Sequence, residues 1–206
     1  LSNLNEGECR DVFKNDKIAV LGYGPQGRGQ SLNLRDNKYP VILGLRKGKS
    51  FDKALSDGWE EDKNLFDIDS ALEQASVVKY LVSDASQITL WPVVNKYLSK
   101  KSNITKTLYF SHGFGIVFHD QTGIVPNDDI DVIMVAPKGP GGLVRENFLK
   151  ENKGINASYA IHQDKTGNAL DKCIALSYGI GSKNLFKTTF ENEVYSDLTG
   201  ERCVLM

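Results

Sequence analysis

The chain has few cysteines, almost no excess charge and no long apolar run, and each absence excludes a class of protein. Its three cysteines, Cys9, Cys173 and Cys203, lie far apart and form no C-x-x-C pair. Because an odd, scattered set fits neither a disulfide framework nor a zinc site, we expect reduced thiols in a reducing compartment. The 25 lysines and arginines nearly balance 26 aspartates and glutamates, for a net charge of −1. A chain-wide basic field is therefore absent, and we expect no nucleic-acid partner.

The apolar residues are too dispersed for a membrane protein. No run approaches the roughly 20 residues that a membrane-spanning helix needs, and the segment LSNLNEGECR lacks the apolar stretch of a secretory signal. We therefore expect no membrane partner and a cytoplasmic location. For a eukaryotic source we expect instead the mitochondrial matrix or a plastid, after removal of a transit peptide. With 40% hydrophobic and 25% charged residues, the chain has the composition of a globular domain.

Short apolar runs alternate with helical segments along the chain. Strands are expected at 17–21, 41–45, 77–82, 107–110, 131–136, 157–161 and 185–189, and helices at 25–36, 51–57, 67–75, 85–100 (with a break near Pro92), 141–150, 165–178 and 190–204. Runs that are apolar throughout indicate strands buried on both faces, as in a parallel sheet. The alternation predicts an α/β fold, a doubly wound and mostly parallel sheet of the Rossmann type.

The segment Gly22-Tyr-Gly24-Pro-Gln-Gly27 is the most informative motif in the sequence. It follows a predicted strand and opens a predicted helix, the context in which a G-x-G-x-x-G motif binds a dinucleotide. Gly22 permits the tight turn, Gly24 lets the backbone approach a pyrophosphate, and Gly27 allows close packing of the helix on the strand. The amides at the helix N-terminus then face the phosphates. The alternative is a glycine-rich turn that holds no ligand.

The end of the second strand indicates which dinucleotide is bound. An NAD-binding domain places an acidic residue there to accept the ribose 2′-hydroxyl, whereas this strand continues into Arg46-Lys47-Gly48-Lys49-Ser50. Arg46, with Lys47 or Lys49 and Ser50, suits a 2′-phosphate through charge, a planar fork and a hydroxyl donor. This predicts NADPH as the cofactor. A solvated basic loop is the alternative.

These motifs and several others together resemble one family. GYGPQGRGQSLNLRDN, GLRKG, LVSDASQ, LYFSHGFGIVF, DIDVIMVAPKGPGG, HQDKTGNA and TTFENEVYSDLTGER, in this order, are similar to ketol-acid reductoisomerase (acetohydroxy acid isomeroreductase). The resemblance implies an enzyme of valine and isoleucine biosynthesis that acts on a 2-aceto-2-hydroxy acid of the 2-acetolactate type. It implies Mg²⁺-dependent alkyl migration, then reduction by NADPH to a 2,3-dihydroxy acid, and a homo-oligomer for the complete enzyme.

The resemblance also assigns roles to individual residues. It implies cofactor contacts at Tyr23, Gly24, Pro25, Gln26, Arg46, Ser50, Asp84, Ala85, Ser86, Gln87 and Gly141, with 84–87 as a loop after the third predicted strand. His112 and Lys138 match active-site residues, and Asp197 and Glu201 match the first pair of Mg²⁺ ligands. Asp197 and Glu201 are also spaced i, i+4, so both carboxylates project from one face of the predicted helix. Hard oxygen donors in that arrangement suit Mg²⁺. A solvated acidic face that includes Glu193 and Arg202 is the alternative.

The resemblance divides the chain into two parts. We expect residues 1–187 to form the NADP-binding domain and residues 188–206 to form the first helix of a helical C-terminal domain that is otherwise absent. With half of the expected site missing, the isolated chain is expected to bind NADPH without turning over substrate. Because a fold does not determine a function, two alternatives remain open: a non-catalytic NADP-binding module and a different NADP-linked reductase.

Overall fold

The computed structural model describes residues 5–150 and 154–204, without the side chains of Glu6, Lys183 and residues 201–204. Its centre is an eight-stranded sheet in the order β3-β2-β1-β4-β5-β6-β7-β8. The strands are β1 (Ile18–Leu21), β2 (Val41–Gly44), β3 (Leu65–Phe66), β4 (Val77–Tyr80), β5 (Thr107–Phe110), β6 (Asp131–Pro137), β7 (Ile155–Gln163) and β8 (Ser182–Lys187). All neighbouring strands are parallel except β6 and β7. The predicted α/β fold with a mostly parallel, doubly wound sheet is confirmed.

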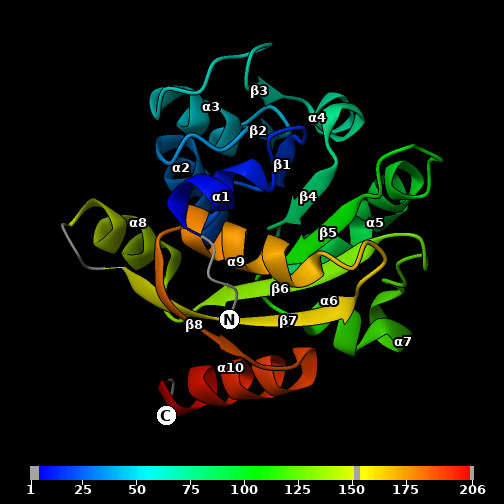
Figure 1. Cartoon of the computed structure of the whole chain (residues 1–206), viewed down its shortest axis with the longest axis vertical. Coiled ribbons are helices and arrows are strands. Elements are labelled where there is room, and N and C mark those ends of the chain that lie inside the picture. Colours follow the sequence, from blue (N-terminus) through cyan, green and yellow to red (C-terminus); the bar gives the residue numbers. More distant parts are fainter. Residues whose placement is uncertain (1–4, 151–153, 205–206) are drawn as a thin grey trace.

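Helices cover both faces of the sheet (Figure 1). They are α1 (Glu6–Asp11), α2 (Pro25–Asp36), α3 (Lys49–Ser56), α4 (Ile68–Gln74), α5 (Asp84–Leu98), α6 (Phe114–Val117), α7 (His119–Thr122), α8 (Gly141–Leu149), α9 (Ala169–Gly179) and α10 (Phe190–Val204). One apolar core joins the sheet to α1, α2 and α9, and a second joins the other face to α4, α5 and the start of α10. Among the described residues, no helix has the length and apolarity needed to cross a membrane.

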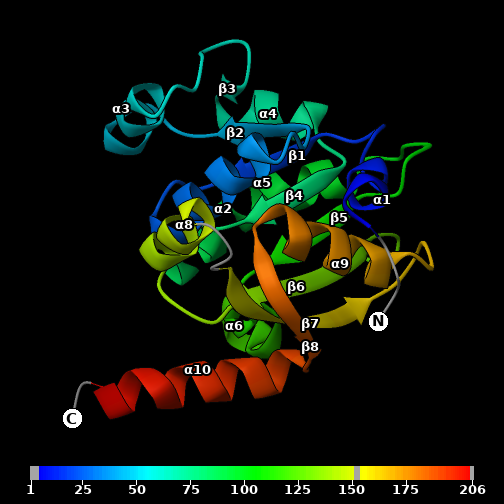
Figure 2. The same cartoon turned by 60° about the vertical axis from the view of Figure 1, so that its left-hand side comes forward.

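The chain reverses its direction of winding at β1. β2 and β3 follow on one side of this strand, whereas β4 and β5 lie on its other side. The two crossovers therefore diverge just beyond the carboxyl end of β1, which is where open α/β sheets bind ligands. Figures 1 and 2 place α3 near one end of the molecule and α10 near the opposite end. An extended ligand that starts at α3 and crosses the end of β1 would thus run toward α10.

Several elements differ from the sequence prediction. The helices α1, α6 and α7 and the strand β3 were not predicted, because each has only two to six residues. The predicted break near Pro92 is wrong, since α5 continues through this proline. Pro92 is exposed, whereas Trp91, Val94 and Leu98 are buried. Burial of these side chains stabilises the helix on both sides of the hydrogen bond that proline cannot donate.

Candidate functional site

The glycine turn leaves the N-terminus of α2 open to a ligand. Gly22 has a φ of 98°, and a Cβ there would lie 2.4 Å from the carbonyl oxygen of Leu81, so only glycine fits. Gly24 is the N-cap of α2, and no side chain caps this helix. A Cβ on Gly24 would have no atom within 4 Å. Unpaired amides behind open space are the arrangement that binds phosphate at a helix N-terminus.

Tyr23 points into the protein and fastens the turn. Its hydroxyl donates to Oδ2 of Asp57 at 3.0 Å and accepts from Nε1 of Trp59 at 2.9 Å. Arg28 binds the same carboxylate through two nitrogens, at 2.6 and 2.9 Å. Hydrogen bonds from Arg28 hold the pKa of Asp57 at about 2, and burial followed by the contact with Asp57 raises the pKa of Tyr23. The turn is therefore tied to the chain that follows α3.

The predicted 2′-phosphate loop follows β2 directly. Leu45 is buried, while the next five residues are exposed. Lys47 is already occupied, because it forms an ion pair with Glu61 and its ammonium lies 3.9 Å from the centroid of the Phe51 ring. Arg46 has no hydrogen bond or ion pair with any residue that the structure describes. Ser50 lies in the first turn of α3, where the helix dipole favours an anion. Arg46 and Ser50 thus present a free cation and a hydroxyl beside a helix N-terminus, which fits a ribose 2′-phosphate.

One open cleft of about 630 Å³ joins the two segments. It is lined by Gly22 and Tyr23 of the turn, by Arg46 and Ser50 of the loop, and by Ser86 of α5. Gly24, Pro25 and Gln26 are not among its lining residues. The cleft fits the adenosine and phosphate part of a dinucleotide, because it combines the first glycine of the turn, the first turns of α3 and α5, and a guanidinium with no partner among the described residues. The structure therefore brings together these predicted cofactor contacts, although they are more than 60 residues apart in the sequence.

The segment 84–87 is the first turn of α5 and not a loop. Asp84 and Ala85 are exposed outside the cleft. Gln87 is only 4% exposed, and its Nε2 faces the carbonyl oxygens of Tyr80 and Val82 at 3.4 and 3.3 Å. Ser86 is the member of this segment that lines the cleft.

Gly141 begins α8 and touches the turn instead of the cleft. A Cβ on Gly141 would lie 2.1 Å from the carbonyl carbon of Pro25 and 2.3 Å from the amide nitrogen of Gln26. This glycine therefore lets α8 approach the start of α2. Its position supports the shape of the turn that faces the phosphates.

The predicted catalytic residues both contact α10 at the other end of the same sheet edge. His112 follows β5, and its Nδ1 lies 3.2 Å from Oδ2 of Asp197 on α10, without the geometry of a hydrogen bond. Lys138 follows β6 and forms an ion pair with Glu193, also on α10. The side chain of His112 is 24% exposed and that of Asp197 is 50% exposed. Both remain accessible to a ligand at this edge.

Glu193 is a site residue that the sequence analysis missed. The sequence analysis named it only as part of the alternative, a solvated acidic face, yet its side chain is only 7% exposed. The carboxylate accepts a hydrogen bond from the Ser158 hydroxyl at 2.9 Å in addition to the Lys138 pair. Its position four residues before Asp197 was the available signal, because residues at i and i+4 share one helical face.

The structure describes the predicted metal site only in part. Asp197 offers exposed carboxylate oxygens, the donors that Mg²⁺ prefers. Glu201 lies on α10, but its side chain is outside the described residues. Among the described side chains, no group of three histidine, cysteine, aspartate or glutamate residues converges to hold a metal. Asp197 therefore fits Mg²⁺ as one ligand of a set that would need further oxygens.

Fold and cleft together define a dinucleotide-binding α/β domain. Residues 12–185 match the family described as acetohydroxy acid isomeroreductase, NADPH-binding domain. The chain belongs to this family, as the sequence motifs predicted.

Named relatives agree with this assignment. A protein of Desulfosudis oleivorans named ketol-acid reductoisomerase (NAD(+)) is 54% identical over 200 residues, which are 97% of this chain and 55% of the relative. A mitochondrial ketol-acid reductoisomerase of Neurospora crassa is 53% identical over 95% of this chain and 48% of its own length. The solved structure of an NADH-preferring ketol-acid reductoisomerase from an uncultured archean aligns with a TM-score of 0.83 at 35% identity, over 95% of this chain and 58% of that one. The chain thus spans about half the length of these relatives.

Proposed function

We propose that this chain is the cofactor-binding part of an NADPH-dependent ketol-acid reductoisomerase. The proposed substrate is a 2-aceto-2-hydroxy acid such as 2-acetolactate, and the product is a 2,3-dihydroxy acid of valine and isoleucine biosynthesis. The observation that carries the proposal is that one edge of the sheet holds two groups of predicted site residues. The phosphate turn and Arg46 lie at a cleft, and His112, Lys138 and Asp197 lie further along the same edge. In this proposal residues 1–187 form the cofactor domain, and residues 188–206 begin the C-terminal domain.

NADPH is preferred over NADH in this proposal because of Arg46. Relatives differ in this respect, since the family is described as NADPH-binding while one relative is named for NAD(+). In this chain the loop after β2 contains no acidic residue to accept a ribose 2′-hydroxyl. The Arg46 guanidinium, which has no partner among the described residues and lies next to Ser50 and the start of α3, favours a phosphate through charge-assisted hydrogen bonds.

The proposed reaction has two stages, migration of an alkyl group between adjacent substrate carbons and reduction of the resulting 2-keto acid. Bound Mg²⁺ would polarise the substrate oxygens, and NADPH would supply the hydride. Asp197, and Glu201 by its spacing, would hold the metal. The ammonium of Lys138, oriented by buried Glu193, would stabilise negative charge on a substrate oxygen and donate a proton to it. His112 would provide a second polar contact on the same side.

The test is oxidation of NADPH by the full-length protein with 2-acetolactate, with and without Mg²⁺. We expect turnover only when both are present. Turnover of other keto acids but not of 2-acetolactate would indicate another NADP-linked reductase. Binding of NADPH without turnover of any keto acid would indicate a non-catalytic module.

Two further parts of the proposal follow from the family. We expect the complete enzyme to form a homo-oligomer, which sedimentation of the full-length protein would measure. The relative in Neurospora crassa is named mitochondrial, and for this protein the cytoplasm, the mitochondrial matrix and a plastid remain the predicted alternatives.

A further inference from the structure

Two glutamine side chains on α2 link the phosphate turn to both catalytic loops. Gln30 is fully buried, and its Nε2 donates to the Ser111 hydroxyl at 2.8 Å and to Oε1 of Gln26 at 3.0 Å. Its Oε1 accepts from the Tyr109 hydroxyl at 2.9 Å. Nε2 of Gln26 in turn donates to the carbonyl oxygen of Gly139 at 3.0 Å. These four hydrogen bonds all join groups of the chain itself.

The partners determine which way each amide points. A backbone carbonyl only accepts, so Gln26 must direct its nitrogen to Gly139 and its oxygen to Gln30. Gln30 must then direct its nitrogen to Gln26, and its oxygen to Tyr109. A buried polar group that loses its partner costs about 1–3 kcal/mol. The two amides therefore have one favourable arrangement.

The contacts end next to the predicted catalytic residues. Ser111 precedes His112 directly, and Gly139 follows Lys138 directly. The Ser111 hydroxyl also donates a hydrogen bond to the carbonyl oxygen of Val135 at 3.0 Å. This bond connects the segment that follows β5 to β6. Gln26 belongs to the turn that faces the phosphates. Gln30 thus lies at the junction of the cofactor-binding turn and the two loops that follow β5 and β6.

We propose that Gln30 is a positioning residue that sets the His112 and Lys138 loops at a fixed distance from the phosphate turn. This inference rests on the proposed function, because it assigns a catalytic role to both loops. The turn fixes where the dinucleotide lies, so the same contacts fix where the nicotinamide lies relative to His112 and Lys138. A misplacement of about 1 Å can lower a rate about 100-fold.

Gln30→Met tests the proposal, with Asn33→Leu as the matched control. Both substitutions replace a fully buried amide on α2 by an apolar side chain of similar size. Asn33 bonds to the carbonyl oxygens of Val144 and Ile180 and to Arg145, and its described hydrogen bonds include none to either catalytic loop. Each variant loses buried hydrogen bonds, and we expect both to lower the melting temperature.

The first readout is the NMR chemical shift of the His112 ring protons at one fixed pH, which needs no turnover. The chain has only three histidines, so the His112 signal can be assigned by replacing each histidine in turn. We expect Gln30→Met to move the His112 ring-proton signals, and Asn33→Leu to leave them unchanged. An unchanged His112 signal in Gln30→Met, or an equal change in Asn33→Leu, would overturn the proposal.

The second readout is steady-state kinetics of the full-length protein with 2-acetolactate. We expect Gln30→Met to lower kcat about 10- to 100-fold while the KM for NADPH changes less than about 3-fold, because the backbone amides of the turn remain. Asn33→Leu should retain kcat at a temperature where both variants are folded. Equal kcat losses in the two variants would reduce Gln30 to a structural role.

Ser111→Ala provides the same test if Gln30→Met does not fold. It removes the hydroxyl that accepts from Gln30, and Ser111 is only partly buried. Unchanged His112 ring-proton signals in Ser111→Ala would contradict the proposal. If the unsubstituted protein does not turn over 2-acetolactate, the proposed function fails, and the His112 ring-proton signals still decide whether Gln30 positions this loop.

Discussion

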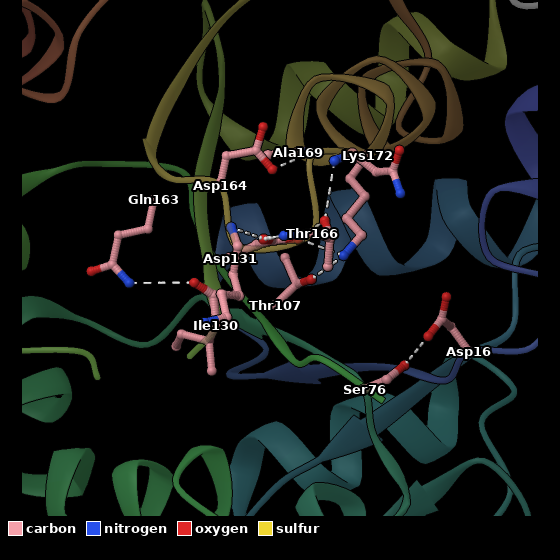
Figure 3. Close-up of polar contacts among 12 residues, drawn as sticks. Asp16, Ser76, Thr107, Ile130, Asp131, Gln163, Asp164, Thr166, Ala169 and Lys172 are labelled. Atoms are coloured by element: carbon pink, nitrogen blue, oxygen red, sulfur yellow. Dashed lines mark hydrogen bonds and ion pairs between the residues drawn. The ribbon is translucent and has the colours of Figure 1, made fainter. Parts of the chain in front are cut away.

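Several polar groups at the carboxyl ends of the parallel strands have no partner among the described residues, whereas a cluster at the amino ends is fully paired. At the carboxyl ends, Gly24 faces open space, Arg46 has no partner among the described residues, and Asp197 is half exposed. At the amino ends, Asp131 is completely buried and Lys172, Thr166 and the amide of Lys165 converge on its carboxylate (Figure 3). Groups that the chain satisfies itself stabilise the fold, whereas groups left without internal partners are available to ligands.

The Asp131 carboxylate accepts four hydrogen bonds. Amides of Lys165 and Thr166 donate at 2.7 and 2.9 Å, and the Thr166 hydroxyl and the Lys172 ammonium donate at 2.7 and 2.6 Å. Burial acts to raise the pKa of Asp131, but the hydrogen bonds from Lys172 and Thr166 outweigh it and leave the pKa below its usual value. The loop that wraps Asp131 also explains why α9 begins at Ala169, four residues after the predicted start.

The largest effect is expected from breaking this saturated cluster. Asp131→Ala leaves the ammonium of Lys172 buried, with Thr107 as its remaining partner. Removing one member of a buried ion pair costs about 3–5 kcal/mol, and we expect a loss of this size in urea unfolding. Asp129→Ala is the control, because this aspartate is 86% exposed in its contact with Lys165 and should cost less than about 1 kcal/mol. Similar losses in both variants would contradict the contrast between the two edges.

The next largest effect is expected on cofactor binding at the carboxyl ends of the strands. The substitutions involved should leave the free energy of unfolding nearly unchanged. Replacing Arg46 and Ser50 together by Asp should weaken NADPH binding about 100-fold, or by ~2–3 kcal/mol, since charge-assisted hydrogen bonds are lost and carboxylates repel phosphate. NADH binding should improve, because a carboxylate accepts the ribose 2′-hydroxyl. Calorimetric titration of both cofactors measures this. Lys47→Met is the control, because Lys47 is held by Glu61 and Phe51, and equal losses there would show a general charge effect.

Lys79 is an exception to this contrast, because it is buried in β4 and has no hydrogen-bond partner in the part of the chain that the structure describes. Its nitrogen lies 3.8 Å from the centroid of the Tyr109 ring, and burial lowers its pKa well below 10.5. The Lys79 amine therefore binds its proton more tightly in the unfolded chain than in the folded chain. The free energy of unfolding should rise as the pH rises toward 10.5.

Lys79→Met should stabilise the protein by about 1–3 kcal/mol at neutral pH, since an unpaired polar group leaves the core. It should also remove the gain in stability at alkaline pH. Urea unfolding at neutral and alkaline pH measures both effects. A destabilised Lys79→Met variant would show that the amine contributes more through the Tyr109 ring than its burial costs.

Sequence patterns predicted the features that depend on neighbouring residues. The glycine turn, the basic loop and the apolar strands are each contained in a few consecutive positions, and the fold class and the family are confirmed. The capping box of α1, in which the side chains of Asn5 and Glu8 each bond to the other residue's backbone amide, is a local sequence pattern that the prediction missed. The pair of Lys138 with Glu193 could not be predicted, because the two residues are 55 positions apart and meet only through the packing of α10.

The smallest effect sharpens the comparison, because Asp57 is a saturated carboxylate on the open side of the sheet. Hydrogen bonds from Arg28, assisted by Tyr23, lower the pKa of Asp57 from 3.8 to about 2. A depressed carboxyl pKa gives stability that is complete above the unfolded value and is lost as the pH falls toward 2. Because Arg28 is 38% exposed and solvent screens the pair, we expect a loss on the order of 1 kcal/mol between pH ~5 and pH ~2.

Asp57→Asn should reduce this acid-dependent loss, measured as the difference in unfolding free energy between the two pH values. NADPH affinity separates the role of Asp57 from that of the open edge. Asp57 reaches the turn only through Tyr23 and Arg28, while the amides behind Gly24 remain in place. The change in affinity should therefore stay below about 3-fold, far from the 100-fold loss expected when charge-assisted bonds to the 2′-phosphate are removed. A large loss of affinity in Asp57→Asn would mean that the turn needs this support to bind phosphate, and that stability and ligand binding are coupled on this side of the sheet.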